Sequence, residues 1–332
     1  MHRFLDLEDL DDQGIKRLLY RAEELKLHPI SDRLRGRVLG LLFMNPSVRT
    51  LASFQAGMAQ LGGSSFVITP GQSSWAFETR PGVVMDGAYA EHVKEAIPVL
   101  AGYCDVLGAR AFAGGDDLAN DLSEPTMTAI AAVCKKPLIN LESAMNHPCQ
   151  ALADWKTLDD LEVPSRGGKF VLSWAYHPKA LPMAVPAAVL TMAARRGMQV
   201  TLLRPDGFEL PKTVMETARQ AASFSGGSIA ETSDRRAAME GAHVLYAKSW
   251  QSSAHYGDPA KETELRAQHR DWCVGEPWFA EADPSAIFMH CLPVRRGVVV
   301  SDEVLDGSRS RVQVQANNRL HVQKSVLLEM LP

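Results

Sequence analysis

The fold of this chain is decided where a buried strand turns into a helix, in residues 38–61, which read VLGLLFMNPSVRTLASFQAGMAQL. Residues 38–44 form an apolar run of strand length, which indicates a strand buried on both faces. Ser47 is a residue type that favours the first position before a helix, and it predicts a helix over residues 47–61. A strand that passes directly into a helix is the repeating unit of α/β folds.

The same alternation continues along the chain. The expected strands fall into two series, Val38–Met44, Ser65–Thr69, Asp105–Ala109 and Pro137–Asn140, then Phe170–Trp174, Gln199–Leu203, His243–Ala247 and Ala286–His290. Helical patterns separate them at Ser47–Leu61, Ala90–Tyr103, Pro125–Cys134, Pro148–Leu161, Met183–Arg196 and Pro211–Ser225. The alternation predicts an α/β chain with two doubly wound parallel sheets.

The alternation pauses between residues 150 and 168, where a helical pattern is followed by a Pro- and Gly-containing loop. We therefore expect one domain over residues 1–150 and a second over 151–315, with a cleft between them. A last helical pattern, Asn317–Met330, lies far from its nearest strand, and we expect the segment 316–332 to return to the first domain.

Composition excludes several classes of protein. The chain has 332 residues, 35 Lys and Arg, and 39 Asp and Glu, so its net charge of −4 does not favour a nucleic-acid partner. We also expect no membrane partner, because no apolar segment is long enough to span a bilayer, and the acidic start of the chain does not resemble a signal peptide. The five widely spaced cysteines suit reduced thiols in the cytoplasm and no thiolate zinc site.

The first candidate site is the helix start at Ser47, Val48, Arg49 and Thr50. Unpaired N–H groups, two hydroxyls and a guanidinium group at a helix start suit a phosphate. The structural alternative, in which Ser47 only caps the helix, is equally compatible with the local sequence.

The second candidate site is the helix start His147-Pro148-Cys149-Gln150, with Glu142 at the preceding strand end. A histidine can polarise a carbonyl oxygen and a glutamine can bind an amide-like group. A structural histidine and a solvated carboxylate are the alternatives.

Further candidates follow later strands and open the last helix. They are Lys248, Cys291 with Leu292, Arg295 and Arg319. For Cys291 the two interpretations are a catalytic nucleophile and a structural buried thiol. For the cations the alternative is an ordinary solvated position at the surface. Taken together, the candidates suit a small anionic substrate. The glycine fingerprints of dinucleotide and Walker-type sites do not occur, which argues against a nucleotide-dependent oxidoreductase.

The order NPSVRT (45–50), HPCQ (147–150), HCLP (290–293) and NRLH (318–321) resembles the aspartate/ornithine transcarbamylase superfamily over the whole chain. The elements SWAFET (74–79), VMDG (84–87) and AKSW (247–250) resemble its N-acyl-ornithine branch. The resemblance implies carbamoyl transfer from carbamoyl phosphate to the δ-amine of N-succinyl- or N-acetyl-L-ornithine, in arginine biosynthesis, without metal or cofactor. It also implies a homotrimer with shared active sites and a trefoil knot in the second domain.

The resemblance also implies a role for each motif residue. Ser47, the Val48 backbone, Arg49 and Thr50 would hold the phosphate, and Arg110 would bridge phosphate and carbonyl oxygen. His147, Gln150 and Arg319 would polarise the carbamoyl group, and the Cys291 and Leu292 carbonyls would accept from amines. Trp75 would reach the carbamoyl phosphate of a neighbouring subunit. The residues expected at the acyl-ornithine are Glu142, His177, Lys248, Arg295, Cys291, Leu292 and Ala90.

Two departures from the family pattern bear on function. Ala90 and Val299 stand where the acetylornithine branch carries a Glu and a Lys, and the missing carboxylate favours the succinyl group. The Pro-rich segment 177–186 also resembles the succinyl branch. Leu51 replaces the second Arg of the phosphate motif, which keeps open the alternative of a catalytically silent ligand-binding protein of the same fold.

Overall fold

A computed structural model describes residues 1–331. The chain forms two compact units. The first unit contains Met1–Gly114, Ala119–Leu152 and the chain from Arg319 onward. The second unit contains Gly115–Leu118 and Ala153–Asn318.

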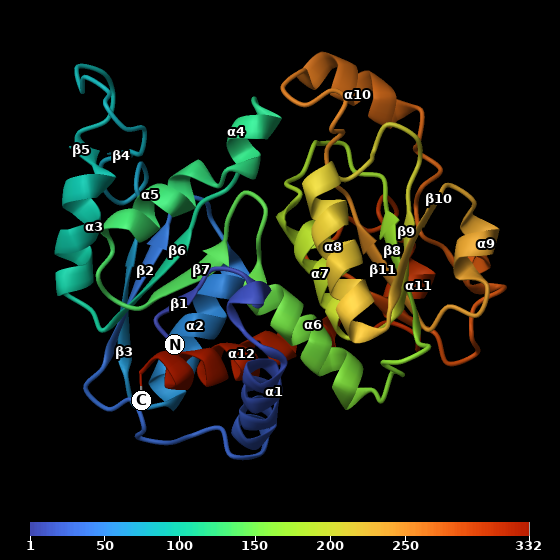
Figure 1. Cartoon of the computed structure of the whole chain (residues 1–332), viewed down its shortest axis with the longest axis horizontal. Helices are drawn as coiled ribbons and strands as arrows, with labels where there is room; N and C mark the ends of the chain where they lie inside the picture. The colour runs from blue at the N-terminus through green and yellow to red at the C-terminus, as the bar shows by residue number, and fades with distance from the viewer. Residues whose placement is uncertain (332) are drawn as a thin grey trace. The chain divides into compact units, whose positions relative to one another are not determined.

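The first unit is built on five parallel strands in the order β1-β7-β6-β2-β3 (Figure 1). Their bounds are Arg3–Phe4, Leu138–Glu142, Val106–Arg110, Val38–Phe43 and Ser64–Ile68. The central strands β2, β6 and β7 are almost wholly buried, as their uninterrupted apolar sequences predict. Parallel pairing brings the carboxyl ends of these strands to one edge of the sheet, where open α/β sheets bind ligands.

Helices cover this sheet and connect its strands. Their bounds are Leu7–Asp9 (η1), Asp12–Leu27 (α1), Val48–Gln60 (α2), Val93–Gly102 (α3), Leu118–Leu122 (α4), Pro125–Val133 (α5) and Pro148–Asp160 (α6). Helices α3 and α5 contribute Ile97 and Ile130 to a buried cluster with Leu107 and Leu138 of the sheet. This packing fixes the start of α5 against the sheet.

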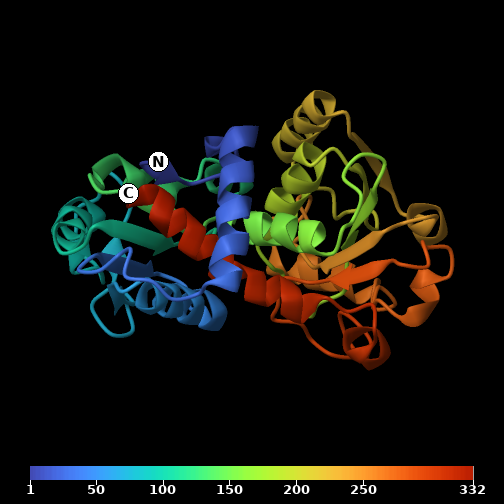
Figure 2. The same ribbon diagram turned by 90° about the horizontal axis from the view of Figure 1, so that it is seen from below.

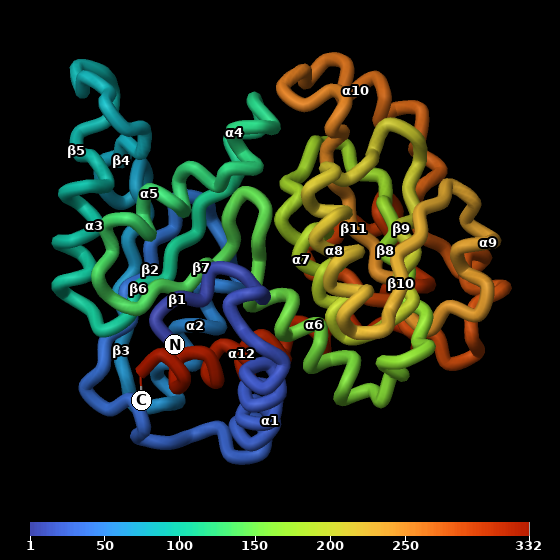
Figure 3. The backbone as a smooth tube through the Cα atoms, in the orientation of Figure 1, coloured from blue at the N-terminus to red at the C-terminus, as the bar shows by residue number. Residues whose placement is uncertain are grey.

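A short arm extends from the first unit. It contains the two-stranded parallel sheet of β4 (Phe77–Glu78) and β5 (Glu91–His92), and the segment between these strands projects away from the five-stranded sheet (Figure 3). Trp75, Val84 and Tyr89 expose large apolar side chains on or beside this arm. Exposed apolar side chains on one segment are a feature of surfaces that bind other proteins.

The last helix, α12 (Val312–Met330), ends in the first unit. The buried Lys324 ammonium donates to the Leu25 and Pro29 carbonyls, each at 3.1 Å, and the Ser325 hydroxyl donates to the Leu18 carbonyl at 2.8 Å. These bonds hold α12 across α1 (Figure 2). The predicted return of the C-terminal helix to the first half of the chain is confirmed.

The second unit has a parallel sheet in the order β10-β9-β8-β11-β12. The strands span Ser228–Thr232, Gln199–Leu203, Lys169–Trp174, Val244–Lys248 and Ile287–Met289. Its helices span Ala184–Arg195 (α7), Lys212–Ser225 (α8), Arg235–Met239 (α9), Pro259–Ala267 (α10), Glu276–Phe279 (η2) and Asp302–Asp306 (α11). The two parallel sheets confirm the predicted fold class, and the trefoil knot stays a prediction.

Within residues 1–331, none of the helices combines the length and the apolar character that crossing a membrane requires.

Candidate functional site

The first part of the site is the junction of β2 and α2. Ser47 is in the extended conformation that precedes a helix, and its hydroxyl accepts from the Thr50 N–H at 3.3 Å. Ser47 is therefore the cap that the structural alternative required. Val48 is 81% exposed, and its side chain has no polar group, so at this position only the backbone N–H can donate to an anion. The first N–H groups of a helix and its dipole attract anions.

Arg319 joins this junction from the start of the C-terminal segment. Its Nη2 donates to Thr50 Oγ1 at 2.6 Å, and both side chains are buried. Burial lowers the pKa of Arg319, and the charges of Arg110 and Arg49 lower it further, whereas Cys149 and Glu142 act in the opposite direction. These couplings place the three guanidinium groups in one electrostatic cluster.

The ends of β6 and β7 complete the cluster. The parallel register shifts between Ala109 and Arg110, so that Arg110 pairs with Glu142. The Arg110 guanidinium group donates to the Glu142 carboxylate, and His147 Nε2 lies 3.6 Å from the same carboxylate. All three side chains are buried. The register shift thus brings an acid, a guanidinium group and an imidazole to one point.

His147 and Gln150 are held at the start of α6. The Gln150 N–H donates to the His147 carbonyl at 3.0 Å, and both side chains are buried. Cys149 between them is fully buried, and burial raises the pKa of its thiol to about 12. A thiol with such a pKa stays protonated at neutral pH, so Cys149 is not a thiolate nucleophile.

The charges of the cluster are unequal. The Glu142 carboxylate pairs with Arg110 and acts on Arg319, and Arg319 is also subject to the positive charges of Arg110 and Arg49. Like charges in a poorly solvated site repel strongly, and a bound dianion would offset that repulsion. The cluster is therefore suited to bind a phosphate group.

A cavity of about 340 Å³ adjoins this edge of the sheet. It is lined by Met44, Asn45, Glu78, Arg80 and Phe112, among others. Asn45 Oδ1 accepts from the Phe112 N–H at 2.8 Å, which ties the loop after β2 to the loop after β6. Sequence reasoning missed this role of Asn45, although its place at a strand end was a usable signal.

The second unit holds its own group of cations. Arg295 Nε donates to His177 Nε2 at 3.1 Å, and the other ring nitrogen of His177 lies 3.0 Å from the Lys179 carbonyl oxygen. Burial lowers the pKa of His177, and the charges of Arg295, Lys248 and Arg266 lower it further. A neutral imidazole beside these cations leaves positive charge for a carboxylate-bearing ligand.

Arg266 was missed by sequence reasoning. It is fully buried beneath the end of β11, where it donates to the Ser249 hydroxyl at 2.9 Å and to the Trp250 carbonyl at 2.7 Å. It also pairs with the buried Glu262. Arg266 therefore fixes the backbone that follows Lys248. An Arg four residues after a Glu on a helix was the available signal.

Cys291 and Leu292 follow β12 in a turn of defined geometry. The Leu292 N–H donates to His290 Nδ1 at 2.9 Å, and the His290 N–H donates to Gln315 Oε1 at 3.0 Å. Leu292 has a positive φ of 53°, which is uncommon for a residue other than glycine. Such a conformation is maintained when surrounding bonds fix it.

The structure thus brings together two groups of predicted residues. The first unit gathers Ser47, Val48, Arg49, Thr50, Arg110, Glu142, His147, Gln150 and Arg319. The second unit contains His177, Lys248, Cys291, Leu292 and Arg295. Trp75 and Ala90 belong to neither cluster. Trp75 is 59% exposed, and its Nε1 donates to Glu91 Oε2 at 2.7 Å. Ala90, which precedes Glu91 in the sequence, is also exposed.

Metal binding finds no support in the described residues. Within residues 1–331, no group of three or more His, Cys, Asp or Glu side chains is arranged to hold a metal ion.

Two family models match the chain, one toward each end. The carbamoyl-P binding domain of aspartate/ornithine carbamoyltransferase matches residues 2–160, and the Asp/Orn binding domain of the same family matches residues 184–330. The N-acetylornithine carbamoyltransferase of Xanthomonas campestris pv. campestris is 38% identical, over 100% of this chain and 98% of that protein. The N-succinylornithine carbamoyltransferase of Bacteroides thetaiotaomicron is 34% identical, over 100% of this chain and 98% of that protein.

Solved structures also match the chain over almost its whole length. An acetylornithine transcarbamylase complexed with acetylcitrulline has a TM-score of 0.96 and 38% identity, over 99% of each chain. A glutamate-to-alanine variant of N-acetyl-L-ornithine transcarbamylase, complexed with carbamyl phosphate and N-succinyl-L-norvaline, also has a TM-score of 0.96 and 38% identity, over 99% of this chain and 100% of that one.

Proposed function

The chain belongs to the aspartate/ornithine carbamoyltransferase family, in its N-acyl-ornithine branch, and from this premise we propose that it carbamoylates the δ-amine of an N-acyl-L-ornithine. The donor is carbamoyl phosphate, and the products are N-acyl-L-citrulline and phosphate. The reaction belongs to arginine biosynthesis. The observation that carries the proposal is the cluster of Arg49, Arg110 and Arg319 at the start of α2.

The residues of the first unit hold the donor. Ser47, the Val48 N–H, Arg49 and Thr50 bind the phosphate at the positive end of α2. Arg110 bridges a phosphate oxygen and the carbonyl oxygen. Multiple charge-assisted bonds orient the labile dianion and stabilise the charge that develops on it.

The chemical step is an acyl transfer. The lone pair of the neutral δ-amine attacks the carbonyl carbon, and the negative charge moves to the carbonyl oxygen, where His147, Gln150 and Arg319 stabilise it. The carbonyl re-forms as the carbon–oxygen bond to phosphate breaks. Phosphate leaves with the electron pair and takes up the proton that the nitrogen loses. The main-chain carbonyls of Cys291 and Leu292 accept from the attacking amine, so the Cys291 thiol takes no part.

The second unit recognises the acyl-ornithine. Lys248, Arg295 and the neutral His177 supply charge and hydrogen bonds for its carboxylates, and Glu142 binds its polar groups. Among the acyl groups we favour succinyl. Ala90 is exposed and carries no charge to repel a second carboxylate, and the buried Val299 replaces a lysine of the acetyl branch. The acetylornithine relative is 38% identical to this chain and the succinylornithine relative 34%, so the preference for succinyl rests on Ala90 and Val299 and not on overall identity.

The assembly we propose is a cytoplasmic homotrimer with shared active sites. Its support is the exposed apolar arm that carries Trp75, Val84 and Tyr89, together with a cavity of about 640 Å³ in the same unit. In this assembly Trp75 completes the carbamoyl phosphate site of a neighbouring copy. The five free cysteines suit a reducing compartment.

A three-substrate comparison tests the function. Purified protein is incubated with carbamoyl phosphate and, separately, N-succinyl-L-ornithine, N-acetyl-L-ornithine or L-ornithine, and the ureido product is measured by a colorimetric citrulline assay. We expect turnover with an acylated substrate, fastest with succinyl, and little with free ornithine. Turnover with none of the three refutes the enzyme and leaves the silent ligand-binding alternative that Leu51 raised.

A further inference from the structure

Glu124 has an unusual backbone for its residue type. It precedes Pro125 at the start of α5 with φ 52° and ψ 48°, in the left-handed region that residues other than Gly, Asn and Asp seldom adopt. Its side chain does not cap α5. A strained conformation of this kind persists where the surrounding structure fixes it, and it then becomes informative about function.

The carboxylate of Glu124 is held by four consecutive residues. Oε1 accepts from the Ser143 hydroxyl at 2.7 Å, the Met145 N–H at 2.8 Å and the Asn146 side-chain amide at 3.4 Å, and Oε2 accepts from the Ala144 N–H at 3.0 Å. Main-chain N–H donors turned toward one carboxylate form an anion-binding turn. The ligand of this turn is a side chain of the same chain.

The turn 143–146 lies between two residues of the reaction site. Glu142 precedes it at the end of β7, and His147 follows it at the start of α6. Internal bonds shape the turn, because the Ser143 N–H donates to the Asn146 carbonyl at 2.8 Å and the Asn140 amide donates to the Ser143 hydroxyl at 2.8 Å. The position of His147 therefore depends on how this turn is held.

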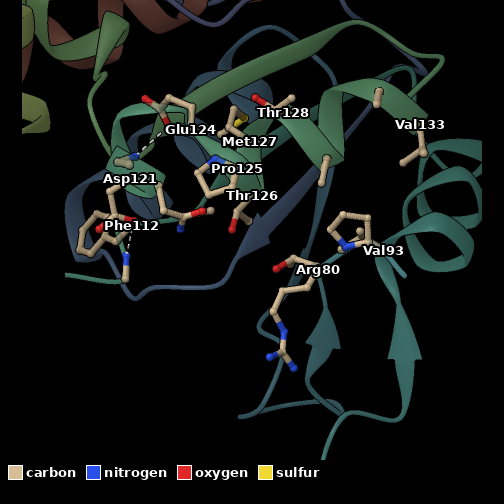
Figure 4. A pocket seen from close by; sticks show the side chains of 18 of the residues that line it. Arg80, Val93, Phe112, Asp121, Glu124, Pro125, Thr126, Met127, Thr128 and Val133 are labelled. Carbon is tan, nitrogen blue, oxygen red and sulfur yellow. Dashed lines mark hydrogen bonds between the residues drawn. The ribbon is translucent and has the colours of Figure 1, made fainter. Parts of the chain in front are cut away.

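Glu124 holds the turn against a separate element. Figure 4 shows Glu124 beside Pro125, Met127 and Asp121 at the wall of the 640 Å³ cavity. Helix α5, which follows it, is packed into the core of the first unit through Met127 and Ile130. A rigid helix thus supports a loop, and the loop supports the His147 side chain. Burial raises the pKa of Glu124, and its four bonds act against that rise.

We propose that Glu124 is a positioning residue that sets His147 and Gln150 against the carbamoyl group, a role that rests on the proposed function. Glu124 does not touch the phosphate cradle of α2 through any of the bonds described above. Its loss therefore displaces the groups that recognise the carbamoyl end and leaves those that recognise phosphate. A purely structural role would weaken both equally.

The test compares two ligands in the Glu124→Gln variant. The amide has the shape of the carboxylate but replaces one acceptor with a donor, which then faces another N–H donor in the turn. Binding of carbamoyl phosphate and of inorganic phosphate is measured by titration calorimetry, and turnover by the citrulline assay. We expect carbamoyl phosphate affinity to fall about 10-fold, as for one lost hydrogen bond, and kcat to fall about 100-fold. Phosphate affinity stays within about twofold.

Two further variants complete the design. Ser143→Ala removes one of the four donors and is expected to give a smaller change of the same kind, which keeps the proposal testable if Glu124→Gln folds poorly. Asp121→Asn is the matched control, because Asp121 lines the same cavity and accepts from the Gly114 N–H at 2.9 Å. It should keep the ratio of the two affinities.

The outcomes separate this role from the function itself. An unchanged ratio in Glu124→Gln and Ser143→Ala, with normal kcat, overturns the positioning role. An equal loss of both affinities overturns it too, in favour of a structural role. If the wild-type protein does not turn over any acyl-ornithine, the proposed function fails, whatever the variants show.

Discussion

Replacing Arg49 should separate ligand binding from stability. In the unliganded protein the charge of Arg49 opposes the charge of the buried Arg319, and Arg110 does the same. Arg49→Met removes one of these like charges and keeps a long apolar side chain. We therefore expect its unfolding temperature without ligand to equal or exceed that of the wild type. Turnover should be lost, because the guanidinium group binds the phosphate.

The size of the effect follows from two charge-assisted hydrogen bonds. At about 1.5 kcal/mol each, their loss costs about 3 kcal/mol, or roughly 150-fold in the Kd for phosphate. At a phosphate concentration of about 100 times the wild-type Kd, binding stabilises the wild type by about 2.7 kcal/mol and the variant by about 0.3 kcal/mol. For a domain of 150–250 residues these values correspond to shifts of about 5–10 °C and about 1 °C.

Differential scanning calorimetry with and without phosphate measures both quantities. Arg236→Met is a suitable control, because Arg236 is an exposed arginine paired with Glu281 on the second unit. It should keep the full phosphate-induced shift. The reasoning fails if Arg49→Met lowers the unfolding temperature without ligand by several degrees, since Arg49 would then support the fold. It fails equally if the variant keeps the wild-type phosphate shift.

Three further predictions rest on other residues. Cys291→Ala should keep near-wild-type turnover because the reaction uses the main-chain carbonyl, and a loss of about 100-fold or more, of the size expected for a catalytic group, would contradict this. Ala90→Glu should lower the succinyl-to-acetyl ratio of kcat/KM because a carboxylate repels the succinyl tail; an unchanged ratio counts against the placement of Ala90. Bonds from Arg80 lower the pKa of Glu78 to about 2, below its usual 4.5. Glu78 therefore adds stability above pH 4.5 that disappears as pH falls toward 2, so the difference in unfolding free energy between wild type and Glu78→Gln should shrink over that range. A difference that does not change with pH would exclude this linkage.

The junction at residues 43–50 shows what a local pattern can predict. Its apolar run, proline and capping serine act through neighbouring residues, and the structure places strand β2, the Ser47 cap and helix α2 where the pattern indicates. The start of α12 shows the opposite case. Residues 312–315 alternate Val and Gln, a period typical of strands, and the predicted helix begins at Asn317 instead of Val312. Tertiary contacts of Gln315 with Asp154 and Tyr246 decide for the helix.

Contacts between distant residues set the limit of sequence reasoning. The bond between Thr50 and Arg319 joins residues 269 positions apart, and the resemblance to a family, not the local pattern, brought them together. Sequence reasoning did not find Glu124, because no motif contains it. Its role depends on a left-handed backbone conformation that the sequence before Pro125 does not indicate. Helix α1 was not among the predicted helices, although its sequence indicates it. Its buried residues Ile15, Leu18, Leu19 and Ala22 repeat at helical spacing.

The distribution of charge explains how a chain with a net charge of −4 selects a small anion. Many of its arginines are neutralised by carboxylates away from the clusters, as in the pairs of Arg17 with Glu329 and Arg296 with Asp306. At the end of β7, by contrast, Glu142 faces more than one guanidinium group. The chain's net negative charge disfavours a polyanion around so localised a site, whereas a small dianion meets only the local field. The same imbalance makes the empty cluster electrostatically strained, so the ligand that relieves the strain is also the one that the site binds most strongly.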